Sequence, residues 1–342
     1  MRDLLTIISN ESICKDKDTY YCDNIDSKSI PEGLSKSYGI VNIGRKSKTR
    51  RSFKINIKNS FAASNILSFL YNIFKTFNNK NSKYLLISIT PYTFFASLLL
   101  IIFNKKFTVY IRSSGYEEYR KIIGVLGPPL YHLMFTIVSI KANLIACNSR
   151  LLEGKNGSVV TPSQLNNKWF NNHIKADLTE AKLLYIGRIK VEKGIFSLVN
   201  IFESLEKNIY LTVVGTGYGN TQLLKRQSNI KIIDFDNKDD SIIQIYDSHN
   251  IFILPSFTEG YSQVIDEALA RRRPVIIFKE ISHVAYKNRE GVFICERNSN
   301  SLSIMIKHIL DNYETIEKKI MLNKYPTKEK FIKSLVDIVN EN

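Results

Sequence analysis

The stretch that decides the fold reads PSFTEGYSQVIDEALA and spans residues 255–270. An apolar run at 251–254 comes before it, and residues 264–272 have the composition of a helix. A strand, a turn and a helix in this order place the turn at the carboxyl end of a parallel sheet, where open α/β folds bind ligands. Glu259 lies in the turn, and Glu267 follows eight residues later on the helix. Because carboxylates accept hydrogen bonds from neighbouring hydroxyls, the pair predicts a sugar or ribose ligand.

The motifs of this stretch resemble a known family. Pro-Ser-x-x-Glu-Gly is followed by Glu-Ala-x-Ala, which starts eight residues after the first glutamate, and then by Pro-Val-Ile at 274–276. This order resembles family 4 of the retaining glycosyltransferases (the group 1 glycosyltransferases), and the resemblance is clear from Lys182 to Ile309. It implies the GT-B fold, an α/β architecture of two Rossmann-like, doubly wound domains facing across a cleft. It also implies that Glu259 faces the donor sugar and that Glu267 holds the ribose hydroxyls.

The rest of the chain fits two such domains. Its 342 residues are long for one domain, and short apolar runs alternate with helical patterns along both halves. We expect an N-terminal acceptor-binding domain at 1–165, a linker at 166–180, a donor-binding domain at 181–325, and a last helix within 326–342 that crosses back to the first domain. Strands are expected at 4–8, 39–43, 84–89, 107–111 and 143–147, and at 182–186, 209–214, 230–233, 251–254 and 274–277. Helices are expected at 62–77, 91–103, 195–206, 219–226, 240–247, 264–272, 301–313 and 328–339.

A cationic loop follows the first strand of the second half. Residues 187–194 read GRIKVEKG and match the Gly-Arg…Glu-Lys-Gly element of the family, which implies that Arg188 and Lys193 grip the donor diphosphate. The chemistry agrees, because a leaving diphosphate gains negative charge that an Arg fork and a Lys charge stabilise. These cations supply the charge that a metal would provide. We therefore predict a metal-independent enzyme without a cofactor, and interpret Asp234-Phe235-Asp236 as a loop.

A glycine loop adds backbone amides to the expected donor site. Residues 213–219 read VVGTGYG, and the third glycine falls one position too early for the dinucleotide pattern. By resemblance, the residues whose backbone lines the nucleotide and sugar pocket are Gly215, Gly217, Gly260, Tyr261 and Ser262. The three arginines at 271–273 are interpreted as a solvated helix end, which the helix dipole favours.

The acceptor side is less clearly marked. Many family members carry a histidine in a first-domain loop, but none of the five histidines clearly falls there. His132 is interpreted as a packed core residue, and His283 as a surface residue. The polar loop after the strand ending at Ile111 contains Arg112 and Glu117, which are the candidates for acceptor or sugar contacts. An internal salt bridge is the alternative for these two residues.

The charge is unevenly divided along the chain. Residues 1–170 hold 24 Lys and Arg against 10 Asp and Glu, and the remainder holds 24 against 22. Since anionic lipid attracts an exposed Lys or Arg by about 1 kcal/mol, the basic first half predicts contact with an anionic membrane or a lipid-phosphate acceptor. The densest cluster, at 44–51, is equally explained as a solvated loop. Nucleic acid is not expected, because the cluster lacks interleaved aromatic residues and a known motif.

Cysteine usage and hydropathy indicate the compartment. The four cysteines show neither pairing nor metal spacing, which fits a reducing cytoplasm. The N-terminal apolar run is too short for a signal peptide. The run at 94–103 is about half a membrane span and is interpreted as a buried helix. We expect a cytoplasmic protein associated with the inner face of the membrane.

The sequence therefore predicts a retaining, metal-independent glycosyltransferase. It would move a sugar from a nucleotide-diphosphate sugar to a glycan or lipid-linked acceptor in the synthesis of a bacterial surface polysaccharide such as lipopolysaccharide or capsule. Two alternatives stay open. One is a nucleotide-sugar epimerase of the same architecture, which acts without an acceptor. The other is a non-enzymic nucleotide-sugar-binding or membrane scaffold protein that has lost turnover.

Overall fold

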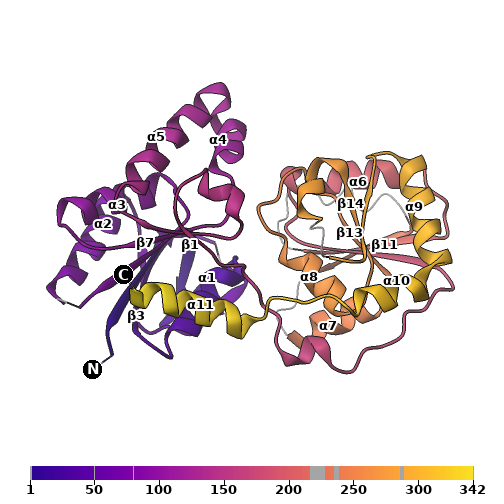
Figure 1. Ribbon diagram of the computed structural model, residues 1–342, viewed down its shortest axis with the longest axis horizontal. Helices are drawn as coiled ribbons and strands as arrows, with labels where there is room; N and C mark the ends of the chain where they lie inside the picture. Colours follow the sequence, from indigo (N-terminus) through magenta and orange to yellow (C-terminus); the bar gives the residue numbers. More distant parts are fainter. Residues whose placement is uncertain are drawn as a thin grey trace. The chain divides into compact units, whose positions relative to one another are not determined.

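The computed structural model divides the chain into two compact units (Figure 1). The first comprises residues 1–164 and 327–342, and the second comprises residues 165–326. The structure describes residues 2–49, 51–79, 81–215, 228–234, 239–285 and 289–341. Each unit is built on its own sheet with helices packed on it, so the predicted α/β class is confirmed in both halves.

The sheet of the second unit is entirely parallel. Its strands are β10 (Ala181–Ile186), β11 (Ile209–Gly215), β12 (Ile230–Asp234), β13 (Ile251–Leu254), β14 (Val275–Phe278) and β15 (Val292–Cys295). They lie in the order β12-β11-β10-β13-β14-β15, which is the doubly wound order with its switch point between β10 and β13. Near-continuous apolar runs form these strands because both faces of the sheet are covered. Strand β15 was not predicted.

Amphipathic helices cover this sheet. They are α6 (Ile195–Phe202), α7 (Asp239–Asp247), α8 (Gln263–Ala270), α9 (Ser299–Asp311) and α10 (Tyr313–Ile320). In α9 the buried residues Leu302, Ile306 and Ile309 recur at helical spacing. The helix expected at 301–313 is α9, which ends at Asp311, and α10 was not predicted. The helix expected at 219–226 lies outside the described residues.

Residues 166–180, expected as a linker, pack onto the second unit. The stretch contains the 3-10 helix η4 (Asn167–Phe170), and Trp169 and Ala176 are buried in the core of this unit. Trp169 meets Tyr246 edge to face, with 5.6 Å between the ring centroids. Although the stretch is polar, it is not a free linker, because its backbone carbonyls accept hydrogen bonds from buried side chains of the second unit.

The interpretation of the arginines at 271–273 as a solvated helix end is wrong for two of them, because Arg271 and Arg273 are each 1% exposed. Arg271 donates to both carboxylate oxygens of Asp247, at 2.9 and 2.7 Å, and to the carbonyls of Trp169, Asn171 and Asn172. Arg273 donates to the carbonyls of Tyr246, Asp247 and Ile174. A buried guanidinium is tolerated when such partners replace water. These arginines therefore fasten the 166–180 stretch to α7 and α8.

The first unit also has a mainly parallel sheet. Its parallel strands are β1 (Leu4–Asp16), β3 (Gly39–Lys46), β5 (Ser60–Ala63), β6 (Lys83–Ile87), β7 (Thr108–Ile111), β8 (Asn143–Ala146) and β9 (Ser158–Val159). Strand β1 pairs with β3 on one side and with β6 on the other. Its far end also pairs antiparallel with β2 (Thr19–Cys22), which pairs with β4 (Phe53–Ile55). Strands β2, β4, β5 and β9 are short and were not predicted.

The helices of the first unit are α1 (Ile25–Leu34), α2 (Ile66–Phe74), α3 (Pro91–Ile102), α4 (Gly115–Ile123), α5 (Gly127–Ser139) and α11 (Lys328–Glu341). Helix α2 begins after its predicted start at 62, because Asn65 forms a capping box with Ser68. Helix α11 comes from the end of the chain and buries Phe331, Leu335 and Val339 in this unit. The Lys83 ammonium donates to the Val339 carbonyl at 2.8 Å.

Candidate functional site

Two loops meet at the switch point of the second unit. One follows β10 and ends with the 3-10 turn at Val191–Lys193, and the other follows β13. Gly194 has a φ of 68°, and a Cβ at this position would lie 1.8 Å from the carbonyl oxygen of Pro255. The Phe257 amide also donates to the Glu192 carbonyl at 3.1 Å. The contact between the loops therefore depends on a glycine.

The contact brings together two of the predicted catalytic residues. The Lys193 ammonium lies 2.6 Å from Glu259 Oε1, and the Ser256 hydroxyl donates to the same oxygen at 2.7 Å. The side chains of Lys193 and Glu259 are 21% and 10% exposed, so the pair is partly shielded from water yet open to a ligand. The Glu259 carbonyl lies 2.8 Å from His283 Nε2. A cation for phosphate and a carboxylate for hydroxyls thus stand side by side.

Arg188, the other predicted diphosphate ligand, is exposed in the same loop. Its carbonyl accepts a hydrogen bond from the Tyr185 hydroxyl at 2.8 Å, which fixes the backbone after β10. Within the part of the chain that the structure describes, its guanidinium makes no ion pair or hydrogen bond. The two cations of the loop therefore differ, since Lys193 is held by a carboxylate and Arg188 extends from a fixed backbone.

Glu267, the predicted ribose ligand, is positioned by a tyrosine that the sequence analysis missed. The Tyr246 hydroxyl donates to Glu267 Oε2 at 2.9 Å. Burial, and then the charge of Glu267, raise the pKa of Tyr246 well above its ordinary value, so this hydroxyl stays a donor. The only signal in the sequence is an aromatic residue four positions after Ile242 on an amphipathic helix, which is typical of a core residue.

Tyr261 was expected to act through its amide, but its side chain joins a buried polar cluster. Its hydroxyl donates to Asp266, and Arg289 lies 2.8 Å from Asp266 Oδ1 and donates to the Tyr261 hydroxyl at 3.0 Å. Burial raises the pKa of Asp266, while Arg289 opposes that shift. Ser262 is buried as the first residue before α8. The cluster fixes the backbone that runs from Gly260 into α8.

Glycine is required at the end of β11 for packing. A Cβ on Gly215 would lie 2.1 Å from the Gly187 carbonyl oxygen, so the ends of β10 and β11 approach closely there. The Gly187 amide donates to the Val214 carbonyl at 3.0 Å. Gly217, the second predicted pocket glycine, lies outside the described residues.

Arg297 supports the loop that carries Glu259 and was also missed. Its guanidinium lies 4.2 Å from the ring centroid of Phe257 and 4.3 Å from that of Phe278. It donates to Glu280 at 2.6 Å and to the Ser256 carbonyl at 3.3 Å. Cation–π contacts of this kind stabilise by about 0.5–1 kcal/mol at exposed sites and more when desolvated. Arg297 therefore links the loop that carries Glu259 to Phe278 at the end of β14.

A family model matches most of the second unit. Residues 180–312 match the family model of the group 1 glycosyl transferases. The matched residues lie within the second unit. The Bacillus subtilis (strain 168) protein TuaC, named as a teichuronic acid biosynthesis glycosyltransferase, is 33% identical over 99 residues, which are 29% of this chain and 25% of the relative. The curated relatives are matched over 25% to 39% of their own length.

Solved structures extend the likeness to both units. Anabaena HepE, determined with UDP and glucose, has a TM-score of 0.74 at 11% identity and covers all of both chains. Sucrose-phosphate synthase from Thermosynechococcus elongatus has a TM-score of 0.70 at 14% identity and covers 99% of this chain and 97% of the other. At such identities the likeness shows the fold alone. The predicted GT-B fold of two Rossmann-like domains is confirmed.

The candidate residues of the first unit have local partners. Arg112 lies 2.6 Å from Asp26, which is fully buried, so it makes the internal salt bridge that was its alternative interpretation. Glu117 is exposed in the first turn of α4. His132 is exposed and lies 2.9 Å from the Tyr116 hydroxyl, so its interpretation as a core residue is wrong. It lies on α5, whose outward face is itself apolar.

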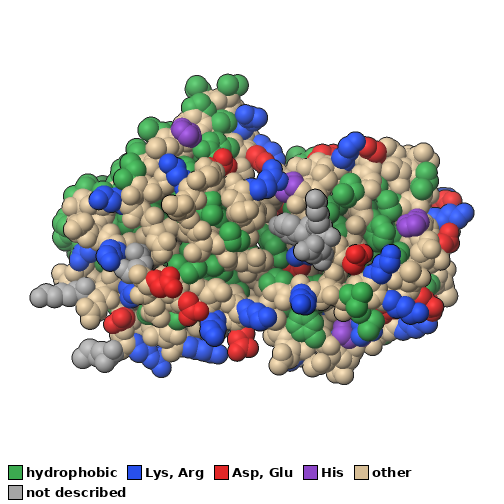
Figure 2. Space-filling view, viewed as in Figure 1, with side chains coloured by type: hydrophobic (Ala, Val, Ile, Leu, Met, Phe, Trp, Pro, Cys, Tyr) green, Lys and Arg blue, Asp and Glu red, His purple; other side chains and the backbone are tan. Residues whose placement is uncertain are grey.

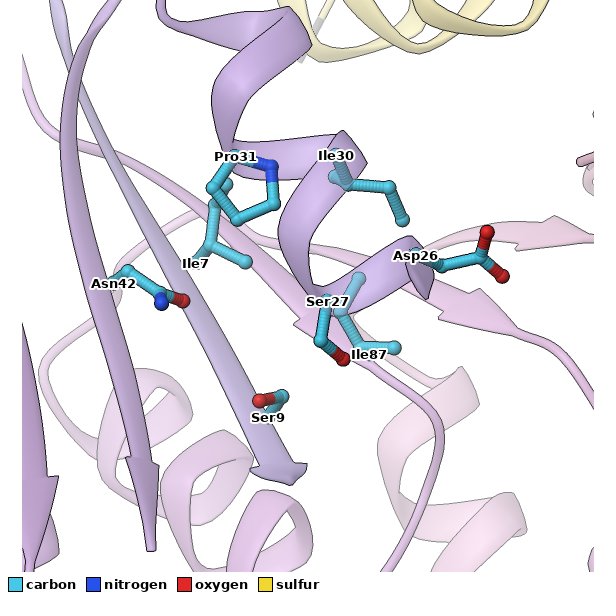
Figure 3. Close-up of a pocket in the computed structure, with 8 residues that line it drawn as sticks. All are labelled: Ile7, Ser9, Asp26, Ser27, Ile30, Pro31, Asn42 and Ile87. Atoms are coloured by element: carbon cyan, nitrogen blue, oxygen red, sulfur yellow. The ribbon is translucent and has the colours of Figure 1, made fainter. Parts of the chain in front are cut away.

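The first unit contains a small pocket beside Asp26 (Figure 3). It is lined by Ile7, Ser9, Asp26, Ser27, Ile30, Pro31, Asn42 and Ile87. The carboxylate of Asp26 faces Arg112 and accepts from the Gln164 amide at 3.0 Å. Such a space has room for about one water molecule.

The structure leaves the metal question open. Among the described residues, no group of three or more His, Cys, Asp or Glu side chains is placed to hold a metal ion. Phe235 and Asp236 of the Asp234–Asp236 stretch lie outside those residues, as does the side chain of Asp234. The expected absence of a metal and of a cofactor stays a prediction.

Proposed function

We propose that the chain is a retaining glycosyltransferase that uses a nucleotide-diphosphate sugar as its donor. The observation that carries the proposal is the 2.6 Å pair of Lys193 and Glu259 at the switch point, in the unit that matches the family model of the group 1 glycosyl transferases. A nucleotide sugar combines the two groups that such a pair recognises, an anionic diphosphate and vicinal hydroxyls. Glu267, held by Tyr246, would accept hydrogen bonds from the ribose.

Donor binding would exchange the partners of this pair. The diphosphate would take Lys193 and the exposed Arg188 as its cations, and Glu259 would then accept hydrogen bonds from the sugar. As the bond from the anomeric carbon to the diphosphate breaks, the diphosphate takes the electron pair, and the two cations stabilise the new charge. The acceptor hydroxyl attacks from the same face, and its proton passes to the departing phosphate oxygen. The scheme requires no enzymic nucleophile, metal or cofactor.

The acceptor would be a glycan or a lipid-linked intermediate of a bacterial surface polysaccharide. Two observations favour this class: the printed name of the Bacillus subtilis relative, and the basic first half of the chain. Arg112 pairs with Asp26 and Glu117 is exposed, and both stay candidates for acceptor contacts. The protein would work in the cytoplasm, at the inner face of the membrane.

Donor binding can be tested by thermal shift with a panel of nucleotides and nucleotide sugars. At about 100 times its dissociation constant, a donor should add about 2.7 kcal/mol to the free energy of unfolding. Glu267→Ala should abolish this increment, whereas Glu314→Ala should keep it, because that side chain is 70% exposed in the same unit. The increment on adding nucleotide is compared within each variant, since removing Glu267 also leaves Tyr246 without its acceptor. If no nucleotide shifts the wild type, the proposal fails.

Turnover distinguishes the proposal from its two alternatives. The protein is incubated with the nucleotide sugar that gave the shift, and the sugar products are followed by proton NMR. Release of an α-configured sugar from an α-linked donor before mutarotation supports retention, and a β-configured first product contradicts it. A nucleotide-linked epimer would instead indicate an epimerase. Binding without hydrolysis or transfer, tested with lipid-linked and glycan acceptors, would indicate a scaffold protein.

A further inference from the structure

The first unit carries a helical hairpin whose far end the proposed chemistry does not use. Helices α4 and α5 pack against each other and are joined by a 3-10 turn at Gly124–Leu126 (Figure 1). The turn is tight, because a Cβ on Gly127 would lie 2.1 Å from the carbonyl oxygen of Tyr119. Residues 121–126 are all exposed, and they form the tip of the hairpin.

Helix α5 is apolar on both faces. Its inner face buries Tyr131, Met134, Phe135 and Val138, which recur at helical spacing. A helix that is apolar all round belongs in a buried or a lipid environment. The exposed hydrophobic side chains of the hairpin are Ile122, Ile123, Val125, Leu126, Leu130 and Leu133. Val125 and Leu126, at the tip, are 88% and 76% exposed.

The exposed apolar surface continues onto the neighbouring helices. Helix α3 packs against α5 and α2, and these helices add Leu67, Tyr71, Phe74, Phe95, Ile102 and Phe103 at its border. We call this surface, with the hairpin residues, the apolar ridge. Figure 2 shows hydrophobic side chains along this edge of the first unit, with Lys and Arg set among them. A contiguous patch of this kind marks an interaction site.

The stretch of chain that contains the ridge is strongly basic, which favours an anionic partner. Residues 33–152, which contain the ridge, hold 18 Lys and Arg against two acidic residues, so this stretch alone accounts for the net charge of +16 of the whole chain. Arg120 and Lys121 are exposed beside the tip. Lys75 lies 4.4 Å from the ring centroid of Tyr71, and Lys105 lies 5.3 Å from that of Phe77. Aromatic residues paired with lysines are typical of segments that lie in a membrane interface.

The geometry decides between crossing a membrane and lying in one leaflet. By length and composition, residues 115–139 could cross a membrane, with a mean hydropathy of 1.6 and 28% of the window buried. The chain reverses at Gly124, where φ is 66°. At 1.5 Å per residue the two helices are about 14 and 20 Å long, and both fall short of the 30 Å or so of a hydrocarbon core. The hairpin can therefore enter one leaflet only.

We propose that the apolar ridge is a membrane-insertion surface for an anionic bilayer. The tip residues Val125 and Leu126 enter the acyl-chain boundary, while the surrounding Lys and Arg side chains bind lipid phosphates. The inference specifies the membrane contact expected from the charge distribution and does not depend on the transferase chemistry. If the proposed function also holds, insertion places the first unit where a lipid-linked acceptor would lie.

The test is co-sedimentation of the full chain with vesicles. Vesicles of phosphatidylcholine with phosphatidylglycerol should bind the wild type, and vesicles of phosphatidylcholine alone should bind it more weakly. The double variant Val125→Asn, Leu126→Asn should lower the partition coefficient by about 100-fold, because two large apolar side chains no longer leave water. Replacing Lys75, Lys105, Lys106 and Lys141 with Gln should remove the preference for the anionic vesicles.

A matched control uses the second unit. Met321 and Leu322 are 56% and 78% exposed there, so Met321→Asn, Leu322→Asn makes the same chemical change and should leave vesicle binding unchanged. Absence of wild-type binding to anionic vesicles would overturn the proposal, as would equal binding by the tip variant. So would light scattering that shows a wild-type oligomer dispersed by the tip variant, because a second copy would then cover the ridge.

Failure of this inference can be told from failure of the proposed function. The tip variant should keep the thermal shift caused by nucleotide, because its substitutions lie in the first unit. Glu267→Ala should in turn keep vesicle binding. If the protein binds nucleotide but no vesicles, only the membrane-insertion proposal fails. If it binds vesicles but no nucleotide, only the transferase proposal fails.

Discussion

The two units hold their cationic side chains differently. In the second unit, several cations are largely buried and bind carboxylates or backbone carbonyls; these are Arg271, Arg273, Lys193 and Arg289. In the first unit, most of the Lys and Arg side chains around the apolar ridge are exposed beside exposed hydrophobic groups. A charge that is fixed in place can be aimed at one ligand. Charges that stay mobile suit a fluid, variable partner such as a lipid surface. The difference fits the proposals that the second unit binds a nucleotide sugar and that the first unit binds a lipid surface.

The largest effect on stability is expected when a buried arginine of the second unit is replaced. Arg271→Met should lower the free energy of unfolding by about 3–5 kcal/mol, because the buried Asp247 carboxylate loses both hydrogen bonds from Arg271 and keeps, among the described residues, only the 3.8 Å contact with Arg273. Three backbone carbonyls would lose their donor as well. Chemical denaturation measures the change. Arg150→Met, at an exposed arginine of the first unit, is the control and should change stability by less than about 0.5 kcal/mol. If both variants lower the free energy of unfolding equally, the buried arginine is no more important for stability than the exposed one.

The next effect concerns rate. Lys193→Met should lower kcat by about 100- to 1000-fold, the range found when one group that stabilises a developing anion is removed. Steady-state assays with the donor identified by thermal shift measure it. Lys36→Met, at an exposed lysine of the first unit, should leave kcat unchanged. An unaltered rate in Lys193→Met would show that the pair with Glu259 is structural only.

A third effect sharpens the role of the first unit. Gly127→Ala should cost about 1–3 kcal/mol by overpacking the hairpin turn, since the new Cβ would overlap the Tyr119 carbonyl. Vesicle binding should fall while the nucleotide-induced thermal shift is kept. Gly39→Ala is the matched control, because its Cβ would lie 3.7 Å from the nearest atom, at ordinary contact distance. Loss of nucleotide binding in Gly127→Ala would contradict independent roles for the units.

The smallest effect is a pH dependence. Burial lowers the pKa of His249 in the second unit, where its ring nitrogens contact the Ile245 carbonyl and the Thr212 hydroxyl at 2.7 Å each. The unfolded chain then binds the proton more readily than the folded one. This contribution to stability is full above the ordinary pKa of about 6.5 and is lost as the pH falls through the lower folded value. Denaturation between pH 7.5 and 5 should show a shallower decline in His249→Gln than in the wild type, and His308→Gln, at an exposed site, should match the wild type.

Much of the second unit could be predicted from sequence, because its strands are continuous apolar runs and its loops carry unusual residues. The 251–254 run and the stretch after it located β13, α8 and both glutamates. What failed were features decided by distant partners. Nothing local distinguishes Arg271, which needs carbonyls some 100 residues away, from an exposed helix end. Tyr246 likewise becomes part of the site only through Glu267.

The first unit was harder to predict for a related reason. Short strands such as β5 and β9 are formed by pairing with neighbours, so they carry little pattern of their own. The hairpin joins a charged helix, α4, to an apolar one, α5, and the chain reverses at Gly124, where φ is 66°. The interpretation of 94–103 as a buried helix is only partly correct, because α3 buries one side and exposes Phe95, Ile102 and Phe103.

The return of helix α11 to the first unit has a consequence for a shortened form of the protein. The core that contains β1 needs Phe331 and Leu335, and Gly33 leaves space for Ile332. A chain that ends at residue 326 contains the whole second unit but lacks the closing helix of the first unit. A variant truncated after Pro326 should therefore resist protease in its second unit and be cleaved readily in its first.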